Sequence, residues 1–218
     1  MNYNKMFKKY GIEIKNHSTM QIAFTHSSYS NEKHTKNYER LEFLGDAVLQ
    51  LITSEYFYLN TDLNEGDMSK KRASFVCETA LATYAKEIGL NKYIRVGHGQ
   101  ANNINDTIIA DVFESTLGAI YLECGFSKAK EYIDKIVLPY VKKGAHFLSD
   151  YKSLLQEMVQ TDKKSLEYVT VKEEGPAHNK TFTISVIIDG ITYGTGVGKS
   201  KKEAEQHAAY DAYQKCAR

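Results

Sequence analysis

The sequence of 218 residues predicts an all-α domain followed by a small α+β domain with the element order α-β-β-β-α. Up to about Lys143, apolar residues recur at every third and fourth position, which is typical of amphipathic helices. Residues 142–149 are polar or small, and beyond them apolar and polar residues alternate as they do in half-buried strands. We therefore expect two domains, at residues 1–147 and 150–218.

Turn-forming residues divide the first domain into helical segments. They fall near residues 60–66, 89–91 and 97–105 and at Gly125. Alternating apolar residues are scarce between these breaks, so we expect helices alone in this half.

One helical segment, YERLEFLGDAVLQLI at residues 38–52, is apolar on nearly every face. Its three acids, Glu39, Glu42 and Asp46, follow the spacing i, i+3, i+7 and project within about 60° of one another on a helix. We expect so apolar a helix to be buried, where one unpaired carboxylate costs several kcal/mol. The only basic residue among them, Arg40, points away, so the compensating charge comes from elsewhere in the fold or from bound metal.

A second apolar segment, NDTIIADVFESTLGAIYL at residues 105–122, repeats the pattern with Asp111 and Glu114 at i, i+3. Carboxylates from two such helices suit a hard divalent cation such as Mg²⁺. One or two metals held in this way can activate water and neutralise the departing oxygen in phosphodiester hydrolysis.

Acids on apolar helices are also often neutralised by basic side chains of a neighbouring helix. Lys70, Lys71 and Arg72 are available for this role. The spacing of the acids leaves both interpretations open.

The second domain begins with a helix, DYKSLLQEMVQ, followed by alternating strands at residues 166–172, 181–188 and 191–197. Asp189-Gly190 between two of these strands is a strong hairpin signal. The last helix starts at Ser200 with Glu203 three residues on, which is the pattern of a capping box.

Three lysines, Lys199, Lys201 and Lys202, crowd the start of that last helix, where the helix dipole is already positive. Such an arrangement is favourable when an anion such as phosphate binds there. The neighbouring GVGKS does not complete a nucleotide-binding loop, because Tyr193 stands at the position where that loop requires a glycine. We therefore expect no nucleotide cofactor. A solvated lysine cluster is the alternative.

The acidic segments resemble the ribonuclease III family. ERLEFLGDAVL at residues 39–49 is similar to the family signature, and DVFESTLGAIYLE at 111–123 to its second acidic motif. THSSY at 25–29 and NEGDMSKKRA at 64–73 resemble further stretches of the catalytic domain. By this resemblance the metal-binding acids are Glu42, Asp46, Asp111 and Glu114.

Within that set, the resemblance singles out Asp46 and Glu114 as the catalytic pair, with Glu39 and Glu65 as accessory acids near the substrate. The chain departs from the family pattern at Tyr38, where many members have Asn, and at Ser115, where Ala is common. Residues 97–105 form a shorter loop than in many relatives. None of these departures falls on an acid.

The α-β-β-β-α order, with GPAHNKTF before the second strand and GKSKKEAEQHAA in the last helix, resembles the double-stranded-RNA-binding domain. Such domains recognise A-form shape over about 16 base pairs. Glu205 stands where some members carry another Lys. The resemblance implies minor-groove contacts from one set of residues and phosphate contacts from another: Gln156, Glu157, Pro176 and His178 for the groove, and Lys199, Lys201 and Lys202 for the phosphates.

Together, these resemblances imply a Mg²⁺-dependent endoribonuclease, with Mn²⁺ as a substitute, that cleaves double-stranded RNA to 5′-phosphate and 3′-hydroxyl ends. They also imply a homodimer that processes ribosomal, messenger and other structured RNA precursors. The alternative is a non-catalytic double-stranded-RNA-binding protein whose acidic helices serve as a dimerisation scaffold.

Composition sets the remaining bounds. No apolar run reaches the roughly 18 residues that cross a bilayer, and the first residues lack the apolar stretch of a signal peptide, so we expect a cytoplasmic protein without membrane contact. The three cysteines are widely spaced and predict neither disulfides nor a zinc site. A net charge of +1 says nothing about nucleic acid, so any basic RNA-binding surface must be local.

Overall fold

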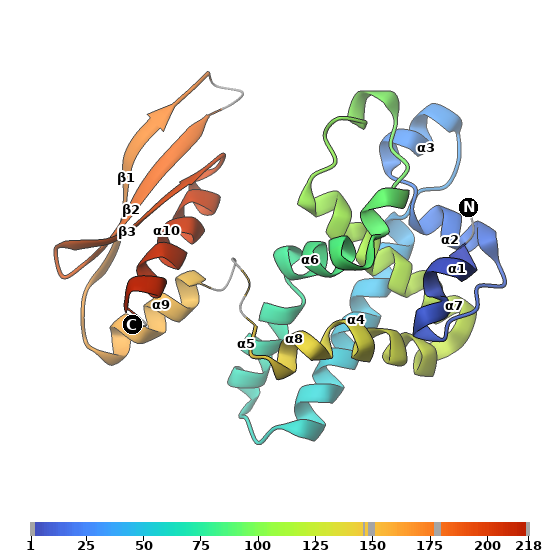
Figure 1. Ribbon diagram of the computed structural model, residues 1–218, viewed down its shortest axis with the longest axis horizontal. Coiled ribbons are helices and arrows are strands. Elements are labelled where there is room, and N and C mark those ends of the chain that lie inside the picture. Colours follow the sequence, from blue (N-terminus) through green and yellow to red (C-terminus); the bar gives the residue numbers. More distant parts are fainter. Residues whose placement is uncertain (1–2, 146, 148–150, 177–179, 217–218) are drawn as a thin grey trace. The chain divides into compact units, whose positions relative to one another are not determined.

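The computed structural model describes residues 3–145, 147, 151–176 and 180–216, without the side chain of Glu157 (Figure 1). The chain forms two compact units, Met1–Ala145 and His146–Arg218. The first unit is helical and the second has the order α-β-β-β-α, which confirms the predicted fold class.

The first unit is built around two long helices. These are α4 (Glu39–Asn60) and α7 (Asp106–Ile136), which pack along each other, while α6 (Glu78–Ile88) covers α7. The backbone of α7 leaves helical geometry at Gly125, where φ is +79°, as the predicted break there indicates. The remaining α-helices of this unit are α1 (Tyr3–Phe7), α2 (His17–Ala23), α3 (Ser27–Lys33), α5 (Glu65–Phe75) and α8 (Leu138–Lys142), and short 3-10 helices lie at Lys8–Tyr10, Leu90–Tyr93 and His98–Gln100.

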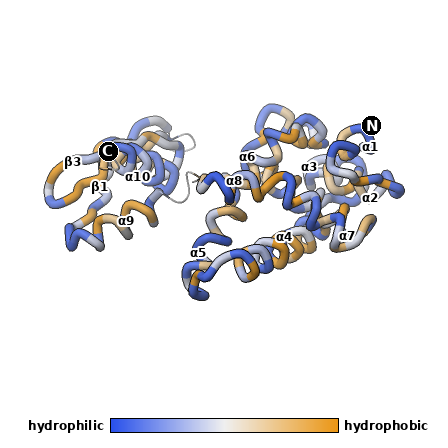
Figure 2. Tube along the Cα trace, turned by 60° about the horizontal axis from the view of Figure 1, so that its bottom comes forward, coloured by the Kyte–Doolittle hydropathy of each residue, from blue (hydrophilic) through white to orange (hydrophobic). Residues whose placement is uncertain are grey.

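The core of the first unit lies between α4, α6 and α7. Fully buried side chains include Leu49 and Ile52 of α4, Tyr84 of α6 and Phe113 of α7. In contrast to these helices, α5 is mostly hydrophilic (Figure 2). Among the described residues, no helix combines the length and the hydrophobicity needed to span a membrane.

The expectation that the apolar segment at residues 38–52 is buried is wrong for one face of α4. Phe43 is 81% exposed and Leu51 is 57% exposed, and Tyr58 and Leu59 of the same helix are also largely exposed. Phe43 and Leu51 are eight residues apart and therefore share one face of the helix. The helix thus has two apolar faces, of which one packs on α7 and the other is exposed.

Ser115, named above as a departure from the pattern that the acidic segments resemble, is fully buried in α7. Its hydroxyl donates to the carbonyl oxygen of Ala23 at the end of α2, at 2.7 Å. The hydroxyl therefore satisfies a helix-end carbonyl that no further turn of α2 can reach. This departure is accommodated in the core and does not touch the acids.

The second unit is a three-stranded antiparallel sheet with two helices against it. Its elements are α9 (Tyr151–Thr161), β1 (Leu166–Glu174), β2 (Thr181–Ile188), β3 (Ile191–Gly198) and α10 (Lys201–Cys216), with strand order β1-β2-β3. Asp189 and Gly190 both have positive φ, at +48° and +79°, as the predicted tight hairpin requires.

Small residues let α10 lie directly on the sheet. A Cβ atom on Gly196 of β3 would stand 2.2 Å from the backbone nitrogen of Ala208, so only glycine fits there. Ala208 is fully buried, as are Leu155 of α9 and Val186 of β2. This packing fixes the start of α10, which carries the lysine cluster, at one end of the sheet.

Candidate metal centre

The acids predicted as metal ligands come from α4 and α7, and two glycines allow these helices to approach closely. Gly45 of α4 faces the backbone of Glu114, and Gly118 of α7 faces the backbone of Leu41. A Cβ atom on Gly118 would stand 2.3 Å from the Leu41 carbonyl oxygen. The close approach brings the acidic positions of the two helices together.

Three of the four acids form one group. Glu42, Asp111 and Glu114 each offer a carboxylate oxygen, and these oxygens lie within 4.8 Å of one another. Two oxygen ligands on opposite sides of a Mg²⁺ ion lie about 4 Å apart, so a small rotation of the side chains would let all three contact one ion. Carboxylates are the ligands that hard divalent cations prefer, and the group therefore fits such an ion.

Asp46 lies outside this group of three. Its carboxylate accepts hydrogen bonds from the side-chain amide of Gln50, at 3.1 and 3.3 Å. Its charge still acts on Glu114 and Glu42. The sequence analysis missed Gln50, although its position one helical turn after Asp46 is the spacing at which side chains meet.

Burial and mutual repulsion make the carboxyl groups of Glu42, Asp111 and Glu114 hard to ionise. Burial, followed by the charges of Asp46, Glu42 and Asp111, raises the pKa of Glu114 to about 8. Burial and the neighbouring acids raise the pKa of Glu42 to about 6, and burial also raises the pKa of Asp111. A cation bound among them would favour the ionised form of each carboxyl group and so lower these pKa values.

Lysine and arginine side chains do not neutralise this group within the part of the chain that the structure describes. No Lys or Arg there forms an ion pair with any of the four acids. Arg72, one of the candidates for that role, donates instead to the hydroxyl of Ser54 at 2.9 Å. The arrangement that the ion-pair interpretation requires is thus absent from the described residues.

Tyr38, the other departure from the pattern that the acidic segments resemble, contacts one of the acids directly. Its hydroxyl donates to Oδ2 of Asp111 at 2.8 Å, and burial together with this carboxylate raises the pKa of the phenol well above its usual value. The two residues are 73 positions apart. The sequence analysis did not anticipate this contact, because no local pattern reports a pairing over such a separation.

The two accessory acids lie apart from the group of three. Glu39 begins α4 and is exposed, although its charge contributes to raising the pKa of Glu42. Glu65 begins α5, is exposed, and accepts a hydrogen bond from Ser69 at 3.2 Å.

The residues predicted to contact RNA belong to the second unit. Gln156 and Pro176 are exposed, whereas His178 and the side chain of Glu157 lie outside the described part of the chain. The three lysines at the start of α10 are exposed, and Lys201 lies 5.8 Å above the ring of Phe182.

The predicted capping box forms with one difference. Ser200 accepts the backbone N–H of Glu203 at 3.1 Å, and the Glu203 carboxylate accepts the N–H of Lys199, at 2.7 Å. The usual reciprocal bond goes to the N–H of the capping residue itself. The Glu203 carboxylate thus accepts the backbone N–H of Lys199, just before α10 begins.

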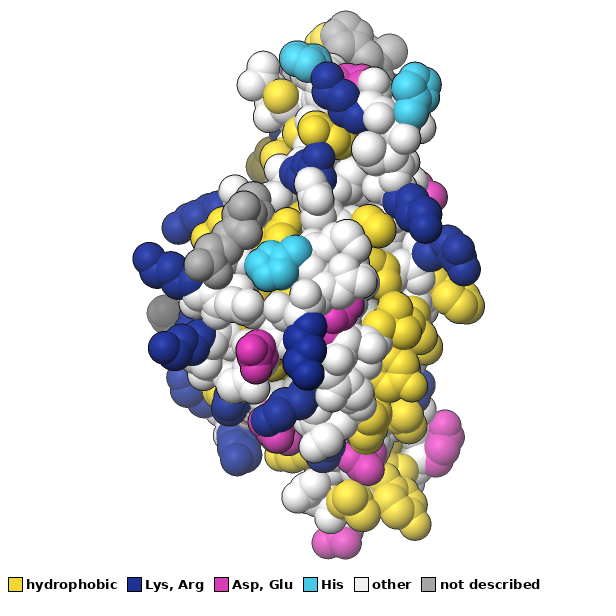
Figure 3. All heavy atoms as spheres, turned by 90° about the vertical axis from the view of Figure 1, so that its right-hand side faces the viewer, with side chains coloured by type: hydrophobic (Ala, Val, Ile, Leu, Met, Phe, Trp, Pro, Cys, Tyr) yellow, Lys and Arg dark blue, Asp and Glu magenta, His cyan; other side chains and the backbone are white. Residues whose placement is uncertain are grey.

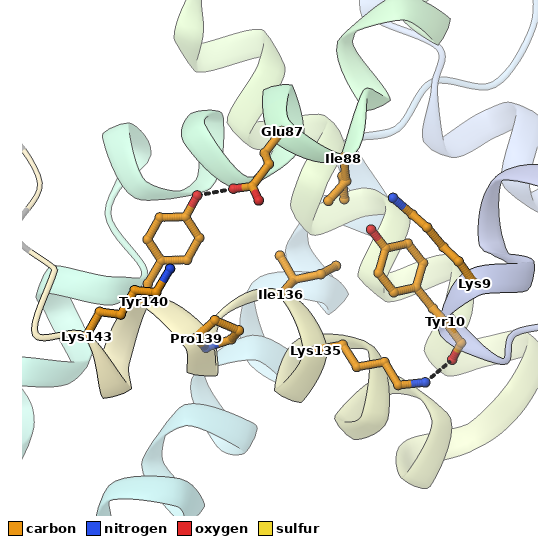
Figure 4. Close-up of a pocket in the computed structure, with 9 residues that line it drawn as sticks. All are labelled: Lys9, Tyr10, Glu87, Ile88, Lys135, Ile136, Pro139, Tyr140 and Lys143. Carbon is orange, nitrogen blue, oxygen red and sulfur yellow. Dashed lines mark hydrogen bonds between the residues drawn. The ribbon is translucent and has the colours of Figure 1, made fainter.

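A separate cavity of about 380 Å³ opens in the first unit between α6, α7, α8 and the segment with Lys9 and Tyr10 (Figure 4). Tyr140 donates a hydrogen bond to Glu87, and Lys135 donates to the carbonyl oxygen of Tyr10 at 3.0 Å. None of the four acids lines this cavity. Two polar side chains of the cavity, those of Tyr140 and Lys135, thus already donate hydrogen bonds to other residues that line it. The cavity is distinct from the candidate metal centre.

Comparison with known proteins covers both units. The family described as "Ribonuclease-III-like" matches residues 16–141, and the "Double-stranded RNA binding motif" matches residues 151–216. The chain is 43% identical over 221 residues to Ribonuclease 3 of Onion yellows phytoplasma, covering 100% of this chain and 92% of that protein. It is 42% identical to Ribonuclease 3 of Listeria monocytogenes, covering 98% and 97%.

A similar solved structure is the nuclease domain of ribonuclease III from Campylobacter jejuni. It matches with a TM-score of 0.58 and 37% identity, and the match covers 62% of this chain and 96% of that one.

Proposed function

The chain belongs to the ribonuclease III family of endoribonucleases that act on double-stranded RNA, and we propose that its cleavage depends on Mg²⁺, with Mn²⁺ as a substitute. One observation carries the metal proposal: Glu42, Asp111 and Glu114 converge without an ion pair to lysine or arginine among the described residues. Uncompensated carboxylates that are partly buried are costly to ionise, and a divalent cation removes that cost.

We propose that Glu42, Asp111 and Glu114 hold the metal and that Asp46 ligates it or orients the attacking water. When bound, the ion supplies positive charge that activates this water and stabilises the departing oxygen. Water adds to phosphorus in line with the 3′-oxygen, which leaves and takes up a proton. The products carry 5′-phosphate and 3′-hydroxyl ends. Asp46 and Glu114 are the proposed catalytic pair, and Glu39 and Glu65 remain candidates for contact near the substrate.

The second unit, proposed as a double-stranded-RNA-binding domain at residues 150–218, would hold the duplex beside the nuclease domain at residues 1–147. The exposed lysines at the start of α10 support this, since a helix start rich in cations is favourable against phosphate. Gln156, Glu157, Pro176 and His178 are proposed to face the minor groove.

We also propose a homodimer that pairs through the exposed apolar face of α4. Phe43 and Leu51 lie on that face, and Leu122 of α7 is 59% exposed. Figure 3 shows one face of the molecule, on which hydrophobic side chains form a continuous stripe. The nuclease domain of the Campylobacter jejuni protein has a region involved in dimer formation. Two symmetric sites would cut opposite strands and leave short 3′ overhangs.

The proposed substrates are ribosomal, messenger and other structured RNA precursors in the cytoplasm. This part of the proposal is supported by the family alone.

Cleavage of a long RNA duplex tests the proposal. We expect the full chain to cut the duplex with Mg²⁺ and to lose cleavage in excess chelator, while Glu114→Ala binds the duplex but does not cut it. Glu131→Ala is the matched control and should cut normally, because Glu131 is a partly exposed glutamate of the same helix whose carboxylate pairs with Lys128 at 2.7 Å. A protein that uses its acidic helices as a scaffold alone would bind RNA without cutting it under all these conditions, and that result would overturn the proposal.

A further inference from the structure

Tyr38 is anchored at the start of α4, directly beside two of the three grouped acids. Its backbone N–H donates to the carbonyl oxygen of Thr25 at 2.9 Å, and its own carbonyl oxygen accepts the N–H groups of Leu41 and Glu42 at 2.8 and 2.9 Å. The residue is only 3% exposed. The position of its ring is therefore determined by the fold of the first unit.

The phenol of Tyr38 spans from α4 to α7. Its hydroxyl donates to Oδ2 of Asp111 at 2.8 Å, which limits rotation of that carboxylate. The same residue thus contacts Glu42 through its backbone and Asp111 through its side chain. These two acids belong to different helices, and Tyr38 links them.

The chemical nature of this donor matters. A lysine or arginine at the same place would neutralise the carboxylate and compete with a divalent cation for it. A phenol orients the carboxylate and leaves its negative charge in place, because the donor is neutral. Groups that hydrogen-bond to metal ligands in this way typically change metal affinity by about 10- to 100-fold.

We propose that Tyr38 is a positioning residue that holds Asp111 in the orientation in which it joins Glu42 and Glu114 around a divalent cation. This inference rests on the proposed metal-dependent function of that group. It assigns a role to a position where the chain departs from the common family pattern.

The test is the affinity of the metal-free full chain for Mn²⁺, followed by the signal of free Mn²⁺ in electron paramagnetic resonance. Tyr38→Phe keeps the ring and removes the hydroxyl, and we expect it to weaken binding about tenfold. Tyr84→Phe is the matched control, because Tyr84 is a fully buried tyrosine of the same unit that donates to a backbone carbonyl, that of Phe75. The control should bind Mn²⁺ as the wild type does.

A second readout separates positioning from a general structural role. If Tyr38 acts through metal binding, Tyr38→Phe needs about tenfold more Mg²⁺ for half-maximal cleavage and recovers the wild-type rate at saturating Mg²⁺. In an Asp111→Asn background, Tyr38→Phe should change Mn²⁺ affinity no further, because its partner carboxylate is already gone.

The outcomes distinguish the two proposals. If the wild type binds Mn²⁺ and Tyr38→Phe binds it with the same affinity, the positioning role is overturned and the metal-dependent function stays intact. A loss of cleavage that saturating Mg²⁺ does not restore would also overturn it. A wild-type chain that binds no Mn²⁺ would overturn the proposed function, and the inference with it.

Discussion

Gly45 of α4 lies so close to Glu114 of α7 that a Cβ atom on Gly45 would stand 1.8 Å from the Glu114 carbonyl oxygen. Real Cβ atoms do not approach an oxygen to this distance, so any other residue would force the helices apart. The separation of α4 and α7 at this point therefore depends on the glycine. The same separation determines whether Glu42 can share a cation with Asp111 and Glu114.

Replacing Gly45 with alanine should disrupt both packing and metal binding. Because Cβ would meet backbone atoms, which cannot rotate away, we expect Gly45→Ala to lower the free energy of unfolding by about 3 kcal/mol. We also expect it to weaken Mn²⁺ binding. Chemical denaturation and metal titration measure these effects. Gly99→Ala is the control, since its Cβ would meet nothing within 4 Å. Wild-type stability and metal affinity in Gly45→Ala would contradict this account.

The raised pKa of Glu114 predicts how the stability of the metal-free protein depends on pH. In the unfolded chain a glutamate ionises near its usual value of 4.5, whereas in the folded chain the pKa of Glu114 is about 8. Protonated Glu114 therefore favours the folded state, and this advantage is lost as pH rises from about 4.5 to about 8. We expect a loss on the order of 2 kcal/mol over this range.

Glu114→Gln should remove most of that pH dependence, because glutamine does not ionise. Thermal unfolding in excess chelator at pH 5 and pH 8.5 measures it. The wild type should lose more stability than the variant between these values. Parallel pH profiles for the two proteins would show that Glu114 ionises normally in the folded state.

The lysine cluster predicts a specific salt dependence of RNA binding. If Lys201 and Lys202 contact phosphates, their double replacement by alanine should weaken duplex binding about tenfold at physiological salt. It should also reduce the slope of log K against log salt by about one per lysine. Filter binding at several salt concentrations measures both.

A matched control for this pair is available in the same unit. Lys163 and Lys164 are exposed and lie next to Ser165, which hydrogen-bonds to Asp189 at the hairpin end of the sheet. Lys201 lies over Phe182, at the opposite end. The Lys163→Ala, Lys164→Ala variant should bind as the wild type does. An unchanged salt slope in the Lys201 and Lys202 variant would remove the phosphate assignment.

The exposed face of α4 predicts a dimer that a single charge can break. Leu51→Asp places a carboxylate on the proposed apolar interface, where its desolvation is costly. We expect this variant to be a monomer by light scattering after size exclusion and to cleave RNA poorly. Val171→Asp, at a valine 62% exposed in the second unit, should stay a dimer. A dimeric Leu51→Asp variant would place the interface elsewhere.

Periodicity alone predicted the elements well. The helices of the first unit and the Asp189-Gly190 hairpin are local features, because side-chain spacing and backbone φ preferences determine them. The spacing of the acids also predicts that Glu42 lies near Asp111 and Glu114, since acids repeated on two apolar helices need a common partner. Glycine inside an apolar helix, as at Gly45, is a signal of close packing that the sequence analysis did not use.

Other features depend on tertiary contacts that no local pattern reports. The contact of Tyr38 with Asp111 joins residues far apart in the sequence, and the pairing of Ser115 with Ala23 does the same. The exposed face of α4 was missed for a different reason. A helix that is apolar all round is compatible with complete burial in one chain and with burial against a second chain, and the sequence does not distinguish them.

The most direct test of the metal centre is a crystal of the full chain soaked with Mn²⁺ and measured for anomalous scattering. The account predicts a Mn²⁺ peak in contact with Glu42, Asp111 and Glu114. A crystal without such a peak, in which lysine or arginine side chains of the protein pair with these three acids, would contradict it.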